Sequence, residues 1–174
     1  MNLQTINEIA SELFLALKQQ ETIQPLTDRF PDIDINNAYQ ISKKFLALRE
    51  SKGEKIVGKK IGVTSKVVQE MLGVNQPDFG FLTNTMQVKN KSNFLINNSL
   101  IQPRAEAEIA FILKEDLYGP GVTQADVIAA TDKICPCFEI VDSRIDQWKI
   151  KIQDTVADNA SCGIFVLGEG DCVP

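Results

Sequence analysis

Two glutamates stand two residues apart in an otherwise mostly apolar segment, PRAEAEIAFIL, at Pro103–Leu113. The segment predicts a β-strand, and successive side chains of a strand point to opposite faces of the sheet. Glu106 and Glu108 are therefore expected on one face. Neighbouring carboxylates can form a solvated strand face or bind a cation. Taken alone, the pair favours the solvated face, because like charges side by side require only water.

A third carboxylate changes this balance. Glu139 lies between Phe138 and Ile140 in a second predicted strand, within the sequence ICPCFEIVDSRI. An ionised carboxylate among such neighbours costs several kcal/mol unless it is paired or bound to a cation. If the three glutamates converge, they form an oxygen-rich site of the kind that hard divalent cations such as Mg²⁺ prefer.

The same glutamates could instead be neutralised by ion pairs. The candidate cations are Arg104, Lys59, Lys60 and Arg144. From the residues alone, the metal site and the ion-pair network are equally supported. The chain has no histidine, which excludes histidine-containing zinc sites and Ser-His-Asp or Cys-His catalysis within it.

A lysine is a further candidate site residue. In IVGKKIGVTS, strand alternation places Lys60 on one face between Gly58 and Gly62, and Lys59 on the other. Glycines beside a strand residue often mark the close approach of a ligand or another backbone segment. We therefore predict that Lys60 points at the site, where it would hold a carboxylate or stabilise an enolate oxygen. The alternative is a pair of surface lysines.

Two other segments carry polar side chains with less specific signals. PDFG at Pro77–Gly80 is interpreted as an ordinary turn with Asp78 making a local hydrogen bond. ADNAS, which ends at Ser161, is either a self-capping helical turn or the polar wall of a pocket. Spacing alone does not decide between these two.

The surrounding elements indicate an α+β fold with two parts. Helices predicted at 3–19 and 35–51 form a helical N-terminal cap over residues 1–53, and residues 54–174 form a β-rich domain with a mixed sheet. In that second part we predict strands at 55–63, 86–88, 94–96, 103–113, 134–142 and 163–169, helices at 64–73 and 123–131, a turn-rich segment at 74–81 and a compact, helical segment at 155–163.

The overall composition is that of a soluble globular protein. The chain has 174 residues, 44% of them hydrophobic, and a formal net charge of −5. With no basic stripe, a nucleic-acid or anionic-membrane partner is not expected. No apolar run approaches the roughly 20 residues of a membrane span, and the N-terminal segment predicts an amphipathic helix, so we expect a cytoplasmic protein. Its four cysteines, Cys172 among them, are expected to be reduced thiols.

Together these segments resemble the 2-keto-4-pentenoate hydratase and 4-oxalocrotonate decarboxylase family, within the fumarylacetoacetate hydrolase superfamily. The resemblance runs in order along essentially the whole chain. It rests on VGKKIGVTSK at 57–66, QPDFG at 76–80, PRAEAEIAF from 103, YGPGVTQADVIAA at 118–130, FEIVDSRI at 138–145 and DTVADNAS at 154–161.

The resemblance implies a fumarylacetoacetate-hydrolase-like β-sandwich or roll in which Glu106, Glu108 and Glu139 hold Mg²⁺ or Mn²⁺. Lys60 would contact the same substrate oxygens as the metal, while Asp78 and Ser161 would line the pocket and help to move protons or place water. It also implies a homo-oligomer in aromatic-compound catabolism, acting on a small 2-oxo or 2-hydroxy-dienoate acid. The expected reaction is hydration of 2-hydroxypenta-2,4-dienoate (2-oxopent-4-enoate), with 4-oxalocrotonate decarboxylation as the alternative.

Members of that family continue beyond the point at which this chain stops. The β-rich domain is therefore expected to be C-terminally incomplete. This leaves a hypothesis of another class, in which the chain keeps the metal ligands but acts only in association with a partner.

Overall fold

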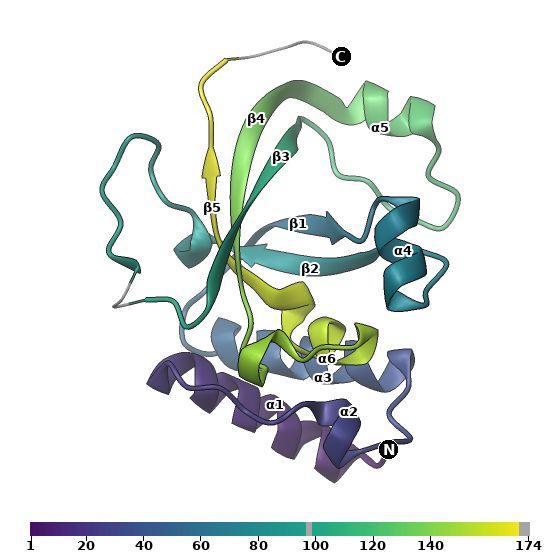
Figure 1. Cartoon of the computed structure of the whole chain (residues 1–174). Helices are drawn as coiled ribbons and strands as arrows, with labels where there is room; N and C mark the ends of the chain where they lie inside the picture. Colours follow the sequence, from purple (N-terminus) through teal and green to yellow (C-terminus); the bar gives the residue numbers. More distant parts are fainter. Residues whose placement is uncertain (97–98, 171–174) are drawn as a thin grey trace.

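The computed structural model describes residues 1–96 and 99–170, which form a layer of helices packed against two small antiparallel sheets (Figure 1). The helical layer contains α1 (Leu3–Gln19) and α3 (Ile35–Glu50), which confirms both predicted N-terminal helices. Their starts are set locally, because the side chains of Asn2 and Asp34 accept hydrogen bonds from the first-turn backbone. A four-residue helix, α2 (Leu26–Arg29), was not predicted.

The main apolar core lies in this helical layer. It also includes α6 (Ile152–Ala157), a short helix from the second half of the chain that packs on α3. The division of the chain at residue 53 stays a prediction, but the helical layer draws on both sides of it. The buried apolar residues of this core are Ile6, Ile9, Ala10, Leu13, Leu26, Ile33, Ala38, Ile41, Phe45, Ile145, Val156 and Ala157.

The first sheet pairs β1 (Ile56–Gly62) with β2 (Asp78–Thr83) in antiparallel register. The turn predicted over PDFG is wrong, since Asp78 begins β2 and lies opposite Gly62. The segment carries a charge and a glycine, so no alternating pattern marked it as a strand. Its extended form depends on pairing with β1 and is not a local preference.

Helix α4 (Lys66–Leu72) follows β1, with Ser65 as its N-cap. The strand predicted at 86–88 is wrong: a 3₁₀ turn, η1 (Asn84–Met86), is followed by a single bridge between Gln87 and Phe165. The strand predicted at 94–96 is also absent there.

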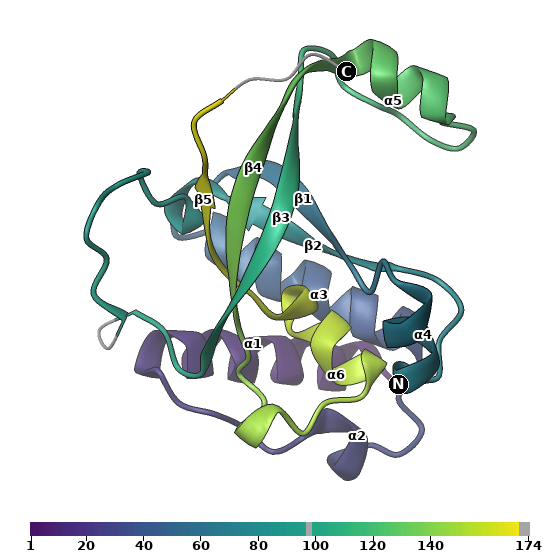
Figure 2. The ribbon, with the colours of Figure 1, turned by 45° about the horizontal axis from the view of Figure 1, so that its top comes forward.

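The second sheet has the order β3-β4-β5, formed by β3 (Pro103–Leu113), β4 (Thr131–Asp142) and β5 (Cys162–Leu167). All three strands were predicted, and β3 has the predicted limits. Helix α5 (Gln124–Ala130) lies at the far end of β3 and β4, away from the helical layer (Figure 2). Its N-cap is Thr123, which is paired with Asp126 in a capping box.

Cys135, Cys137 and Cys162 are free thiols, as expected, and Cys172 lies outside the described residues. Within 1–96 and 99–170, no helix is both long and apolar enough to cross a membrane.

Candidate metal centre and active site

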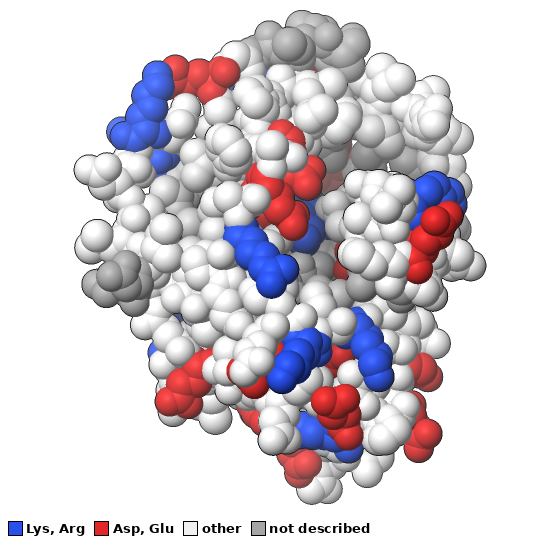
Figure 3. Space-filling view, viewed as in Figure 1, with Lys and Arg blue, Asp and Glu red and all other residues white. Residues whose placement is uncertain are grey.

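The three glutamates meet on one face of the β3–β4 pair. Antiparallel pairing sets Glu106 directly opposite Glu139, and Glu108 follows two residues later on the same face. One carboxylate oxygen from each lies within 4.8 Å of the others. Glu106 and Glu108 are exposed, whereas Glu139 is only 5% exposed. Figure 3 shows acidic side chains gathered over the middle of these strands, with basic side chains beside them.

Lys60 reaches this cluster from the other sheet. Its ammonium nitrogen lies 3.3 Å from Oε2 of Glu139, and both side chains are largely buried. Among the described residues, it alone of the four candidate cations pairs with one of these glutamates. The Lys59 ammonium instead lies 5.8 Å from the ring centres of Phe79 and Phe81. The structure therefore separates the two lysines as strand alternation suggested.

The other two candidate cations contact groups other than the glutamates. The guanidinium of Arg144 pairs with Asp158, and both side chains are fully buried below the sheets. Arg144 also donates to the backbone carbonyls of Cys162 (3.0 Å) and Asp158 (2.7 Å), so it ties β5 to the helical layer. Arg104 lies over the ring of Trp148.

The electrostatics of Glu139 and Lys60 are coupled. Burial raises the pKa of Glu139, Lys60 opposes that rise, and the like charges of Glu106 and Glu108 add to it. For Lys60, burial alone lowers the pKa, but Cys162, Glu139, Asp78 and Glu106 outweigh burial and leave the pKa raised. The ammonium therefore remains charged at neutral pH and partly offsets the acidic cluster.

One oxygen of this cluster has no partner. Oε1 of Glu139 is buried and accepts no hydrogen bond within the described part of the chain. A buried, unsatisfied carboxylate oxygen is costly. With two further carboxylates beside it, the donor set fits a hard divalent cation, which Glu106, Glu108 and Glu139 could hold through oxygen alone.

Asp78 lies next to Lys60 on the same sheet. It is 5% exposed, and its Oδ1 is a second buried oxygen without a partner among the described residues. Burial raises the pKa of Asp78, the Lys60 charge lowers it, and Glu106 adds to the rise. A side chain at position 62 would collide with this carboxylate, so Gly62 leaves the room that Asp78 occupies.

Ser161 is buried in η4 (Asn159–Ser161), a tight turn just before β5. Its hydroxyl oxygen lies 3.0 Å from that of Thr155, the one hydrogen-bond partner recorded for it in the described ranges. The structure thus brings Lys60 and Asp78 to the glutamates, and ties the Ser161 hydroxyl to α6.

The neighbouring Asn159 has a positioning role that sequence reasoning left undecided. Its side chain accepts from the backbone N–H of Phe81 (2.8 Å) and donates to the carbonyl of the same residue (2.9 Å). The η4 backbone passes close to β2: a Cβ at Gly80 would lie 2.5 Å from the Asn159 carbonyl oxygen. These contacts hold the first sheet, and with it Lys60, against the second.

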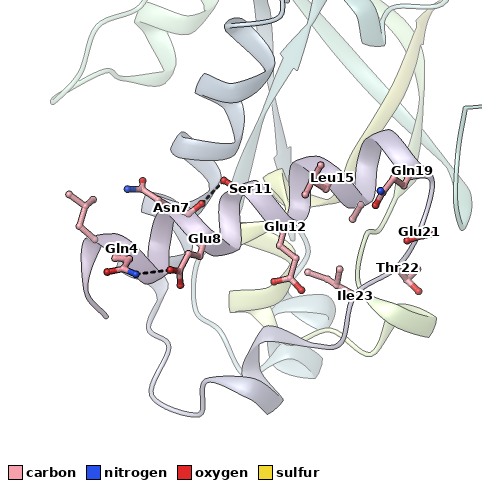
Figure 4. Close-up of a pocket in the computed structure, with 12 residues that line it drawn as sticks. Gln4, Asn7, Glu8, Ser11, Glu12, Leu15, Gln19, Glu21, Thr22 and Ile23 are labelled. Atoms are coloured by element: carbon pink, nitrogen blue, oxygen red, sulfur yellow. Dashed lines mark hydrogen bonds between the residues drawn. The ribbon is translucent and has the colours of Figure 1, made fainter.

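A surface groove lies elsewhere, along the outer side of α1 (Figure 4). It has a volume of about 840 Å³ and is lined by α1 and by the residues 21–23 that follow it. None of the predicted site residues lines it, and its charged lining residues are Glu8, Glu12 and Glu21. We therefore take the glutamate cluster as the candidate active site.

The chain is similar in sequence to known hydratases. No protein-family model matches the sequence. The chain is 63% identical over 164 residues to a 2-hydroxypent-2,4-dienoate hydratase of Pseudomonas putida, covering 94% of this chain and 74% of that one. The chain belongs to the 2-keto-4-pentenoate hydratase family.

Other family members match over a smaller share of their length. A 2-keto-4-pentenoate hydratase of Paraburkholderia xenovorans strain LB400 is 44% identical over 174 residues, which is 100% of this chain and 64% of that protein. A 2-hydroxyhexa-2,4-dienoate hydratase of Comamonas testosteroni is 59% identical, and this chain spans 63% of it.

The fold also matches a solved structure closely. The 4-oxalocrotonate decarboxylase of Pseudomonas putida G7, complexed with magnesium and adipate, superposes with a TM-score of 0.94 at 33% identity, covering 99% of this chain and 65% of that one. The same enzyme complexed with calcium and acetate gives a TM-score of 0.92. The mixed helix-and-sheet architecture of the family is thus present here.

Proposed function

We propose that this chain carries the metal centre of a hydratase that adds water to 2-hydroxypenta-2,4-dienoate and yields 4-hydroxy-2-oxopentanoate. The observation that carries the proposal is the convergence of Glu106, Glu108 and Glu139 beside Lys60, in a chain 63% identical to a 2-hydroxypent-2,4-dienoate hydratase. Because the chain spans 64% of another matched hydratase, the activity of the whole protein belongs to the proposal.

The three glutamates would hold Mg²⁺ or Mn²⁺. Structures of the related decarboxylase contain magnesium or calcium, which are cations with the same preference for oxygen ligands. When bound, such a cation supplies Lewis-acid polarisation of a 2-oxo acid. Because Glu106 and Glu108 are exposed, they leave the cluster open to an incoming substrate.

The protein's own groups then orient the substrate and move protons. Lys60, a cation buried beside Glu139, is placed to stabilise negative charge on the carboxylate and the 2-oxygen as the dienol becomes the ketone. That ketonisation adds a proton to the carbon chain and leaves an electron-poor alkene, to which water adds at C4. Asp78 is a buried carboxyl beside Lys60 and would exchange protons or position this water. Ser161 would line the same pocket through its backbone.

A decarboxylase is the second candidate. The close structural match to 4-oxalocrotonate decarboxylase favours it, and loss of CO₂ would use the same carboxylates and the same stabilisation of negative charge. The higher identity to hydratases, 44–63% against 33%, ranks hydration first. The finer assignment to a fumarylacetoacetate-hydrolase-like roll, a homo-oligomeric state and a cytoplasmic location also belong to this proposal.

The test is the loss of 2-hydroxypenta-2,4-dienoate absorbance with the purified chain, with and without a chelator. We expect turnover that the chelator abolishes and that added Mg²⁺ or Mn²⁺ restores. Parallel incubation with 4-oxalocrotonate, with CO₂ as the readout, separates the two reactions. Chelator-resistant hydration would contradict the metal-dependent mechanism. A folded, metal-binding chain without turnover would instead support the hypothesis that it acts only in association.

A further inference from the structure

A second cation lies beside the glutamate cluster, on the same face of β3, and the proposed function does not use it. Arg104 is the second residue of β3 and lies opposite Val141. It precedes Glu106 by two residues, so both side chains project from the same face of the strand. Arg104 therefore occupies the row next to the Glu106–Glu139 pair, on the side nearer the helical layer.

The guanidinium of Arg104 is held in place by an aromatic ring. Its central carbon lies 4.3 Å from the ring centre of Trp148, the shortest such contact recorded in the described chain. The indole N–H of Trp148 donates to the Gln102 carbonyl at 3.0 Å. The Gln102 amide in turn donates to the carbonyls of Ser143 (2.9 Å) and Ile145 (2.7 Å). The ring is thus fixed to the end of β4, and it fixes Arg104.

The charge of Arg104 is not used within the protein. The other three arginines each pair with a carboxylate: Arg29 with Glu12, Arg49 with Glu54 and Arg144 with Asp158. Across 1–96 and 99–170, no carboxylate lies within ion-pair distance of Arg104. The side chain of Arg104 is exposed, and the flat face of its guanidinium stacks on the Trp148 ring. The N–H edge of the guanidinium is therefore available for two parallel hydrogen bonds to a carboxylate.

We propose that Arg104, positioned by Trp148, binds the carboxylate of the substrate and selects 2-oxo acids over their uncharged analogues. The inference rests on the proposed function for the class of substrate. Lys60 is already paired with Glu139. Arg104 is the cation beside the cluster whose charge an incoming carboxylate would meet without displacing an internal partner.

The experiment uses 2-oxopentanoate, the saturated analogue that cannot be hydrated, and its neutral amide. Calorimetric titration of the Mg²⁺-loaded protein gives the affinity of each. For Arg104→Gln we expect the affinity for 2-oxopentanoate to fall on the order of tenfold to a hundredfold, with that for the amide unchanged. Arg104→Lys should retain part of the affinity. Trp148 is the single tryptophan, so its emission should change on binding the acid.

Matched variants separate recognition from folding. Arg29→Gln removes another arginine that stacks on an aromatic ring, 5.3 Å from the ring centre of Phe30, and should bind both ligands as the unmodified protein does. Trp148→Ala should weaken binding of the acid, while Trp148→Phe keeps an aromatic face and should preserve it. Arg104→Gln should bind Mn²⁺ at least as tightly as before, because a positive charge beside the cluster is lost.

Three results would overturn the inference. They are equal affinity of Arg104→Gln and the unmodified protein for 2-oxopentanoate, an equal loss for the acid and the amide, and no binding of 2-oxopentanoate by the unmodified protein. Hydration assays on the same samples keep the two proposals apart. Turnover with Arg104-independent binding contradicts this inference alone. Arg104-dependent binding without turnover contradicts the hydratase alone.

Discussion

The helical layer and the β3–β4 sheet differ in how far their large apolar side chains are buried. In the helical layer, large apolar side chains such as Phe45 and Leu13 are completely buried. On β3 and β4, Ile109, Phe111 and Phe138 are more than half exposed. By contrast, a carboxylate, Glu139, is buried in the same sheet, with only 5% of it exposed.

This difference indicates where folding free energy comes from. Burial of apolar surface in the helical layer stabilises the fold. The glutamate cluster instead adds like-charge repulsion and a buried Glu139 oxygen without a partner among the described residues. Arg144 is hydrogen-bonded to β5 of this sheet, and Asn159 is hydrogen-bonded to β2 of the other sheet. The helical layer therefore supports a site that is unfavourable on its own, and the exposed apolar face of the sheet contributes little to stability.

The largest expected effect is a difference in stability between two variants, each of which loses one phenylalanine from one of the two regions. Phe45→Ala removes a fully buried ring and should lower the free energy of unfolding by about 3–5 kcal/mol. Phe138→Ala removes a ring that is 57% exposed and should cost less than about 1 kcal/mol. Urea denaturation of both variants checks this contrast. Similar losses for the two would mean that the sheet face is as well packed as the core.

A smaller effect is expected where the two sheets are held together. A Cβ at Gly80 would lie 2.6 Å from Cys162 Sγ and against the η4 backbone, so Gly80→Ala should cost about 1–3 kcal/mol. Gly58→Ala is the matched control on the paired strand, because its nearest contact, Leu82 Cδ1, is at 3.9 Å. The melting temperatures of both variants provide the test, and a harmless Gly80→Ala would show that η4 can move away from β2.

The sequence allowed correct prediction of the elements that are determined by residues close together in the chain. The capped starts of α1 and α3 and the alternation in β3 each lie within a few residues, so their limits were predictable. Strand β2 was mistaken for a turn because its extended form depends on β1, some twenty residues earlier.

The candidate site shows the same limit. Strand alternation predicted that Glu106 and Glu108 share a face. Alternation together with the flanking glycines, Gly58 and Gly62, predicted that Lys60, not Lys59, points at the site. The register that sets Glu106 opposite Glu139 arises from the pairing of β3 with β4, and no spacing in the sequence specifies it. The stacking of Arg104 on Trp148 likewise joins residues 44 positions apart, so sequence reasoning could treat Arg104 only as a possible ion-pair partner.

The smallest expected effect is on stability, and neutralising one glutamate should raise stability in the sheet but lower it in the helical layer. Glu106→Gln removes a like charge opposite Glu139 and should raise the stability of the metal-free protein by up to about 1 kcal/mol. Glu12→Gln breaks the surface pair with Arg29 in the helical layer and should lower stability by about 0.2–1 kcal/mol. Chemical denaturation in the presence of a chelator measures both. A loss of stability in Glu106→Gln would contradict the repulsion described above.

The most direct test of the central claim is calorimetric titration of Mn²⁺ into the unmodified protein and into the double variant Glu106→Gln, Glu108→Gln. Both glutamates are exposed, so the variant should fold, and circular dichroism can verify that it does. We expect one Mn²⁺ per chain in the unmodified protein and at least a tenfold loss of affinity in the variant, because two of three oxygen donors lose their charge. Equal affinity in both proteins would contradict the assignment of Glu106, Glu108 and Glu139 as the metal centre.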